Sequence, residues 1–145
     1  MVLPLALLAL VVITGLVACA FASAYVEQRV GRNTLYAVQA AGAAEVGATA
    51  VVGAWDGNGL SLLAPGASTV LPTEAIPGSS AYSPSVRRLN DQLFLLEVEG
   101  MRTAADATPL ARRRIGVVLR MADSAGSEHP VVGPLAQRAW ISTAF

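Results

Sequence analysis

The chain carries few side chains of the kinds that do chemistry, and they are scattered along it. One histidine, His129, and one cysteine, Cys19, exclude multi-histidine metal sites, thiolate clusters and an internal disulfide. Asp106 and Asp123 fall in expected turns, which does not favour an acid–base pair. The sequence therefore predicts no catalytic residue, no metal and no cofactor, and we do not expect an enzyme.

Anion-binding motifs are also incomplete. The glycines at 53, 57 and 59 are not followed by the Lys-Ser/Thr that ends a phosphate-binding loop. The run Arg112–Arg114 is expected on a strand, whose alternating faces separate the three guanidinium groups. Ten basic residues balance ten acidic ones, so the net charge is zero. Without clustered cations, nucleic acid is not an expected partner.

The most informative element is the uncharged run at 1–26, MVLPLALLALVVITGLVACAFASAYV. As a helix it spans about 39 Å, more than the roughly 30 Å of a bilayer's hydrocarbon core. A core helix of a soluble protein needs only one apolar face. The run therefore predicts a helix that lies in a membrane or in the core of a bundle of helices.

Three interpretations of this helix compete. A secretory signal could end at Ala22-Ser23-Ala24, and Leu16-Val17-Ala18-Cys19 resembles a lipobox that would make Cys19 the acylated residue. Both classes normally begin with a basic stretch, and none precedes the apolar run. We favour a helix that stays on the mature protein, with a leader removed before Met1.

The rest of the chain divides into three segments. Residues 27–54 are rich in alanine and contain no proline, which predicts an amphipathic continuation of the helix. The sequence WDGNG at 55–59 is a helix stop, and four prolines predict a loop over 55–85, with a short strand at 60–63. Residues 85–145 are expected to form an antiparallel β-sheet, so the fold class is α+β.

Two stretches of this sheet alternate apolar and polar residues with period two: Leu93–Val98 and Arg112–Met121. Joined by a turn at Thr103–Thr108, they form a hairpin in which Glu97 faces Arg114 and Glu99 faces Arg112. The opposite face is then apolar and should pack against helix residues 30–54; its members are Phe94, Leu96, Ile115, Val117 and Leu119. Leu89–Gln92 is an expected turn after a strand at 85–89, and residues 137–145 an expected closing strand.

One apolar first helix, a helical extension and a small antiparallel sheet resemble the layout of type IV pilins and pseudopilins. The start MVLPLALLALVVITGLV is similar to their mature N-terminus, and VEQRVGRNTLYAVQAAGAAEVG at 26–47 resembles a segment of PilX-type minor pilins. The resemblance covers residues 1–50. It implies a pilin-like fold and a bacterial filament subunit, with Met1 exposed by a peptidase and N-methylated.

The chain departs from the pilin pattern in three places. Leu5 stands where most major pilins carry a glutamate, which favours a minor or specialised subunit. Ala22 stands near the usual place of a proline, and the paired C-terminal cysteines of many pilins are missing. We nevertheless expect Gly15 to help interrupt the helix near Thr14–Ser23 in an assembled filament, because glycine and hydroxyl side chains weaken regular helix.

The resemblance implies a structural role in a type IV pilus-like fimbrium or a type II secretion-like filament, serving adhesion or protein secretion. Expected partners are other copies of the chain, other pilins, the inner-membrane assembly machinery and, before assembly, membrane lipid. The location would be the bacterial inner membrane first, then an extracellular or envelope-spanning filament. The expected assembly residues are Leu3, Leu5, Leu8, Val12, Gly15, Leu16 and Phe21. The alternatives are a lipoprotein or binding module tethered at Cys19, and a single-span membrane protein that never polymerises.

Overall fold

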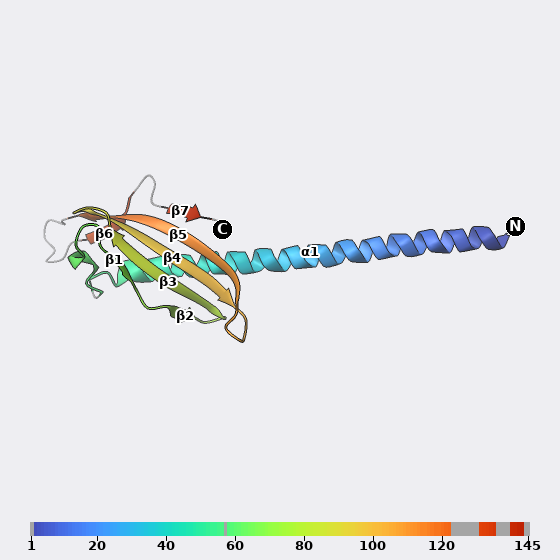
Figure 1. The fold of residues 1–145 in the computed structure, drawn as a ribbon, viewed down its shortest axis with the longest axis horizontal. Helices are drawn as coiled ribbons and strands as arrows, with labels where there is room; N and C mark the ends of the chain where they lie inside the picture. Colours follow the sequence, from blue (N-terminus) through green and yellow to red (C-terminus); the bar gives the residue numbers. More distant parts are fainter. Residues whose placement is uncertain (1, 57, 123–130, 136–139, 144–145) are drawn as a thin grey trace. The chain divides into compact units, whose positions relative to one another are not determined.

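The computed structural model describes residues 2–56, 58–122, 131–135 and 140–143. The chain forms two compact units, Met1–Leu35 and Tyr36–Phe145. The first unit is helical, and the second holds the end of the same helix and an antiparallel sheet (Figure 1). The expected α+β class, a long apolar N-terminal helix with a small antiparallel sheet, is confirmed.

Helix α1 runs without interruption over Val2–Gly53. Abundant alanine supports it, and Pro4 lies in the first turn, where a missing N–H costs no hydrogen bond. The expected stop is confirmed: the helix ends two residues before Trp55, and Gly59 has a left-handed φ of 63°. The expected strand at 60–63 is wrong, since Leu60–Leu62 form a short 3-10 helix, η1.

The described strands form one antiparallel sheet in the order β1-β3-β4-β5-β6, with β2 also paired to β3 and β7 to β5 (Figure 1). Each outer side of the sheet is therefore two short strands placed end to end, and short edge strands limit pairing with other chains. The bounds are β1 Ser68–Val70, β2 Glu74–Ile76, β3 Ser80–Arg88, β4 Leu93–Thr103, β5 Pro109–Ala122, β6 Val131–Pro134 and β7 Trp140–Thr143.

The loop expected over 55–85 is corrected by the structure, because β1, β2 and most of β3 fall inside it. Pro84 shows how a proline is accommodated there. The Pro84 carbonyl accepts a hydrogen bond from the Leu71 N–H at 2.9 Å. The nitrogen and carbonyl of a strand residue point to the same neighbour, so the proline nitrogen also faces the segment between β1 and β2. The proline nitrogen therefore does not face β4, and the β3–β4 ladder loses no donor at Pro84. The closing strand expected at 137–145 is present as β7, over its described residues.

The β4–β5 hairpin has the predicted faces but not the predicted register. Glu99 is opposite Arg114, and Glu97 is opposite Gly116, a shift of two residues from the expected pairs. Two local features together cause this shift of two residues. The loop begins at Ala104 rather than at Thr103, which shifts the pairing by one. Leu110 is an extra residue at a bulge between the pairs Thr103↔Pro109 and Arg102↔Ala111, which shifts it by one more. A shift of two keeps every side chain on its face.

The core lies between the sheet and the last turns of α1. Its helix-side members recur every three or four residues, so they form one stripe. They are Ala40, Ala43, Ala44, Ala48 and Val51, followed after the helix by Trp55 and Leu60; the sheet contributes Tyr82, Val86, Phe94, Leu96, Val98, Ile115, Val117 and Leu119. Packing was expected from residue 30. The side chains at 30–35 are exposed, and the buried stripe begins at Ala40.

Two glycines set how closely the helix and sheet approach. A Cβ on Gly100 of β4 would lie 2.0 Å from the Ala40 carbonyl oxygen and 2.5 Å from the Ala44 nitrogen. A Cβ on Gly47 of the helix would lie 2.5 Å from the Tyr82 ring. Both distances are far inside van der Waals contact, so the backbones meet where a side chain would separate them.

Arg88, the last residue of β3, ties the segment after the helix to the β3–β4 turn. Its guanidinium donates to the carbonyls of Ser61 and Leu63 at 3.2 and 2.6 Å, and to those of Asn90 and Asp91 at 3.0 and 2.8 Å. The group also lies 5.3 Å from the centroid of the buried Phe94 ring. The planar, five-donor fork of arginine suits this role, which a lysine could not fill.

We predict that Gly100→Ala destabilises the full-length chain in detergent by about 1–3 kcal/mol or more, because the added methyl meets helix backbone. Gly42→Ala is the matched control, since a Cβ there meets nothing within 4 Å. It should be neutral or stabilise by up to about 1 kcal/mol. Chemical unfolding followed by circular dichroism measures both; equal effects would refute the close approach.

We predict a second contrast on β4. Leu96→Ala should cost about 2–5 kcal/mol, because Leu96 is fully buried, and should lower the amount of subunit in cells. Glu97→Gln, one residue away on the exposed face, should change the unfolding free energy by less than about 1 kcal/mol. The same unfolding measurement tests it. If Glu97 proved the more sensitive, the faces of the sheet would be wrong.

Candidate assembly site

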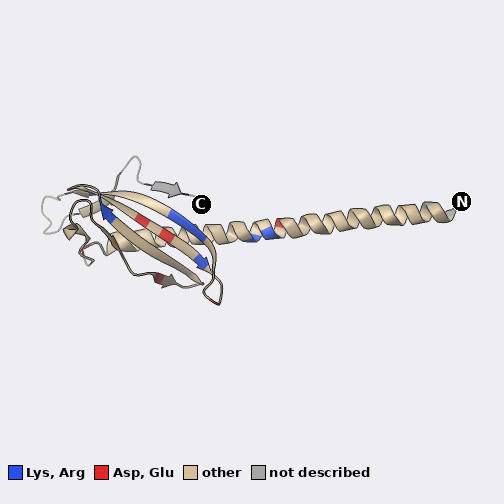
Figure 2. Ribbon diagram, in the orientation of Figure 1, with Lys and Arg blue, Asp and Glu red and all other residues tan. Residues whose placement is uncertain are grey.

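The unit at residues 1–35 presents apolar side chains on all sides of its helix. Every side chain described between residues 3 and 26 is exposed, including Leu3 at 78% and Phe21 at 74%. Figure 2 shows no charged residue on this stretch. The helix is long and apolar enough to cross a membrane, and none of its most apolar window is buried within the chain.

The expected assembly residues fall on two sides of this helix. At about 100° per residue, positions 8, 12, 15 and 16 lie within an arc of about 100°, and Leu3 and Phe21 lie roughly opposite. A Cβ on Gly15 would meet nothing within 4 Å, so the structure shows no contact that requires glycine there. Leu5 is helical, although its side chain, like all of Met1, lies outside the described residues.

The polar atoms within the apolar run are few. The Thr14 hydroxyl donates to the Leu10 carbonyl at 2.7 Å, which satisfies it inside its own helix. Cys19 is an exposed free thiol. The helix is regular through Thr14–Ser23; the expected interruption concerns an assembled filament and stays a prediction.

A short charged band follows the apolar run. Glu27, Arg29 and Arg32 are exposed, and Figure 2 shows them as the first coloured turns of the helix. Neither arginine is three or four residues from Glu27, the spacings at which helix side chains meet. Within the described part of the chain these three side chains form no ion pair.

Charges on the sheet form a compact cluster. The Glu99 carboxylate accepts from Arg114 at 2.9 Å and from Arg112 at 3.3 Å. The hydrogen bond to Glu99 raises the pKa of Arg114 further above its ordinary value. The arginine run is thus engaged by a carboxylate, as the sequence indicated, but one glutamate faces two arginines instead of two facing one each.

Other residues considered for chemistry are not brought together. Across the described ranges, no group of three or more His, Cys, Asp or Glu side chains is placed to hold a metal ion. His129 and Asp123 lie outside those ranges. The Asp106 carboxylate accepts from the Thr108 N–H at 3.0 Å in the β4–β5 loop, and this hydrogen bond lowers its pKa.

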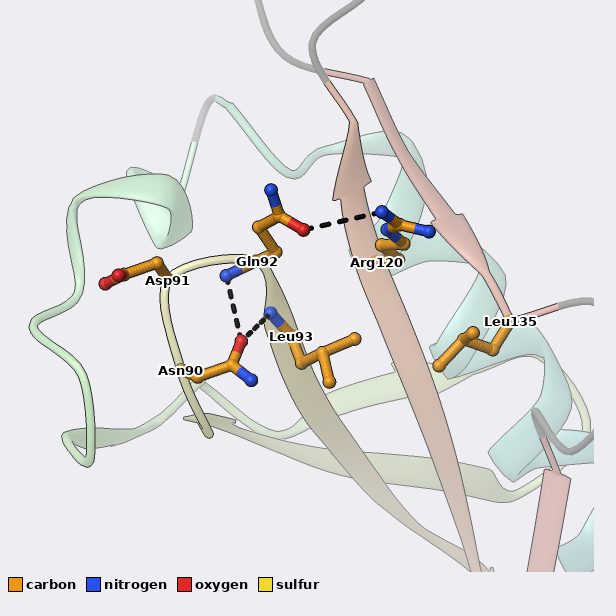
Figure 3. Close-up of a pocket in the computed structure, with 6 residues that line it drawn as sticks. All are labelled: Asn90, Asp91, Gln92, Leu93, Arg120 and Leu135. Atoms are coloured by element: carbon orange, nitrogen blue, oxygen red, sulfur yellow. Dashed lines mark hydrogen bonds between the residues drawn. The ribbon is translucent and has the colours of Figure 1, made fainter.

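A surface depression of about 560 Å³ lies at the β3–β4 turn (Figure 3). The Asn90 side-chain oxygen accepts from the N–H groups of Gln92 and Leu93 at 2.9 and 2.8 Å, which fixes the predicted turn. Arg120 reaches Gln92 at 3.5 Å, and Asp91 points away from both in the view. These polar groups hold a turn and leave no nucleophile beside a base.

The sequence analysis did not predict one hydrogen-bonded pair, which joins a buried tyrosine to an exposed glutamate. Tyr82 is 5% exposed, and its hydroxyl donates to the Glu74 carboxylate directly across the β2–β3 ladder. This hydrogen bond, then burial, then the carboxylate's charge raise the pKa of Tyr82 to about 12. No local signal marks the pair, because β2 lies between two prolines in a segment that resembles loop.

Comparison with protein-family models, with curated proteins and with solved structures returned no match to this chain. The site must therefore be interpreted from its own geometry: an exposed apolar helix, a charged band, and a sheet packed on the last helical turns.

We predict that Glu74→Gln lowers the pKa of Tyr82 towards its ordinary value near 10, because the strongest acceptor of its proton is lost. Absorbance titration of the tyrosinates measures this, with Glu97→Gln as control. An unchanged titration would contradict the pairing.

The same pair has a consequence for alkaline stability. The folded-state pKa lies above that of the unfolded chain, so the contribution is complete below about pH 10 and is lost as the pH rises towards about 12. The wild-type chain should lose stability in that window, and Glu74→Gln should lose less.

Proposed function

We propose that the chain is a structural subunit of a type IV pilus-like or type II secretion-like filament. Before assembly the subunit is anchored in a membrane by its first helix. It then polymerises by packing that helix against the helices of other subunits. The sheet domain would coat the outside. The partners are other copies, other pilins and the machinery that assembles them.

The observation that carries this proposal is that every side chain described within residues 3–26 is exposed, although nearly all are apolar. In water, each large apolar side chain left exposed forgoes about 1.5–3 kcal/mol of burial, so the helix must be covered by lipid or by protein. Alanines at 6, 9, 18, 20, 22 and 24 let helices approach closely, as small residues do in membrane helix pairs.

Two further features support a pilin-like subunit. The resemblance to PilX-type minor pilins covers residues 1–50, with Arg29, Gly31 and Asn33 at or near the matching places. In the second unit, the end of the helix is integrated into the core of the sheet by its alanine stripe. The residues proposed to polymerise and those packed on the sheet therefore belong to one uninterrupted helix, Val2–Gly53.

A lipoprotein or binding module anchored at Cys19 is the second candidate, and the exposed thiol after Leu16-Val17-Ala18 favours it. A single-span membrane protein that never polymerises is the third. The three candidate functions predict different covalent modifications of the chain and different assembled states. Both properties can be measured on the same cells.

We expect this chain in filaments sheared from cells and sedimented, with an intact mass that begins at methylated Met1. Cys19→Ser should leave the filament yield unchanged, because the thiol is only a small apolar group in this account. A diacylglycerol on Cys19 with residues 1–18 missing would identify a lipoprotein, and Cys19→Ser would then release the chain from membranes. A chain that sediments only with membranes would be the third candidate.

A further inference from the structure

The apolar helix by itself does not set how neighbouring copies align. Residues 3–26 present no charge, and the Thr14 hydroxyl is bonded within its own helix. One apolar helix can slide along another with little change in the area buried, because the hydrophobic effect is non-directional. Charged groups can set axial register and direction, and the charged side chains nearest to the apolar run are Glu27, Arg29 and Arg32.

Glu27 lies on one side of the helix, and Arg29 and Arg32 lie together on the opposite side. At about 100° per residue, Arg29 is about 200° and Arg32 about 140° around from Glu27. The helix therefore has an acidic side and, about 3 to 7.5 Å further along its axis, a basic side. Side chains so placed cannot neutralise one another within the same helix. All three side chains are exposed.

We propose that this band is a self-complementary contact in which Glu27 of one copy pairs with Arg29 and Arg32 of the next. The inference rests on the proposed filament function and names the contact that aligns its subunits. Copies inserted in one membrane are parallel. In a symmetric pair of parallel helices, arginine would face arginine or glutamate would face glutamate, which is unfavourable. Contact between the acidic side of one copy and the basic side of the next is favourable.

Such a contact is heterologous, since different surfaces of the two copies meet. When its rotation does not close a ring, it repeats as an open helical filament. Level pairing also requires an axial offset: Arg29 and Arg32 lie about 3 and 7.5 Å further along the helix than Glu27, at 1.5 Å per residue. The copy that offers Glu27 must therefore be displaced forward of its neighbour.

The chain already contains the same chemistry in its sheet. Glu99 accepts from Arg112 and Arg114 at 3.3 and 2.9 Å, one carboxylate between two guanidinium groups. Exposed ion pairs add little affinity, but charge pattern selects partner and direction, and like charges in contact oppose association. The apolar helix supplies the attraction and the charged band supplies the alignment.

The test uses charge reversal of the full chain in cells lacking the native copy. Glu27→Arg makes both sides of the band basic, and the double variant Arg29→Glu/Arg32→Glu makes both sides acidic. Each alone should lower the chain in sheared filaments by about tenfold or more, since every contact along the polymer becomes repulsive. Expressed together they should restore filaments, in which the two variants alternate.

Glu45→Arg, the same exchange at an exposed glutamate outside the band, is the matched control and should assemble as the wild type does. Equal amounts of each variant in membranes show that insertion is unaffected. The inference is overturned if either charge-reversal variant alone assembles normally. It is also overturned if co-expression of the two variants fails to restore filaments, which is the result expected if the arginines bind only lipid phosphate. Absence of wild-type filaments would instead refute the proposed function, and this contact with it.

Discussion

An apolar helix surface that the chain does not cover is the constraint on which the rest depends. Side chains on every side of residues 3–26 are exposed, so this helix has no stable place in water. Lipid satisfies it, and so does a bundle of like helices. Transfer of the helix from lipid into a helix bundle changes the hydrophobic free energy little, because its surface is covered by apolar groups in both. Packing of small residues and polar contacts must therefore decide whether the helices associate.

The sheet domain solves a different problem with the same helix. Its interface consists mainly of alanines, and the two glycines, Gly47 and Gly100, remove the side chains that would hold the backbones apart. Large apolar residues come from the strands and from Trp55, whose ring meets Phe94 edge-on with centroids 5.1 Å apart. One face of the helix end is thereby fixed in the core of the second unit.

Period-two alternation and the uncharged run were enough to predict the helix, the sheet and the faces of the β4–β5 hairpin. The register was not predictable, because the bulge at Leu110 lies outside the alternating stretches and leaves no mark on them. The strand expected at 85–89 is the end of β3. β1, β2 and the first half of β3 were missed because prolines resemble loop unless the neighbouring strand is known, as at Pro84. Of the site, the exposed helix was predicted from the absence of charge, whereas the contacts of Arg88 and Tyr82 join segments that only the fold brings together.

The central claim is that residues 3–26 pack against other copies of the same helix. Electron cryo-microscopy of material sheared from cells tests it most directly. The account predicts a helical filament with α-helical density along its axis, assignable to residues 3–26, and sheet domains on the outside. A preparation in which this chain occurs only as single helices within lipid, with no polymer, would contradict it.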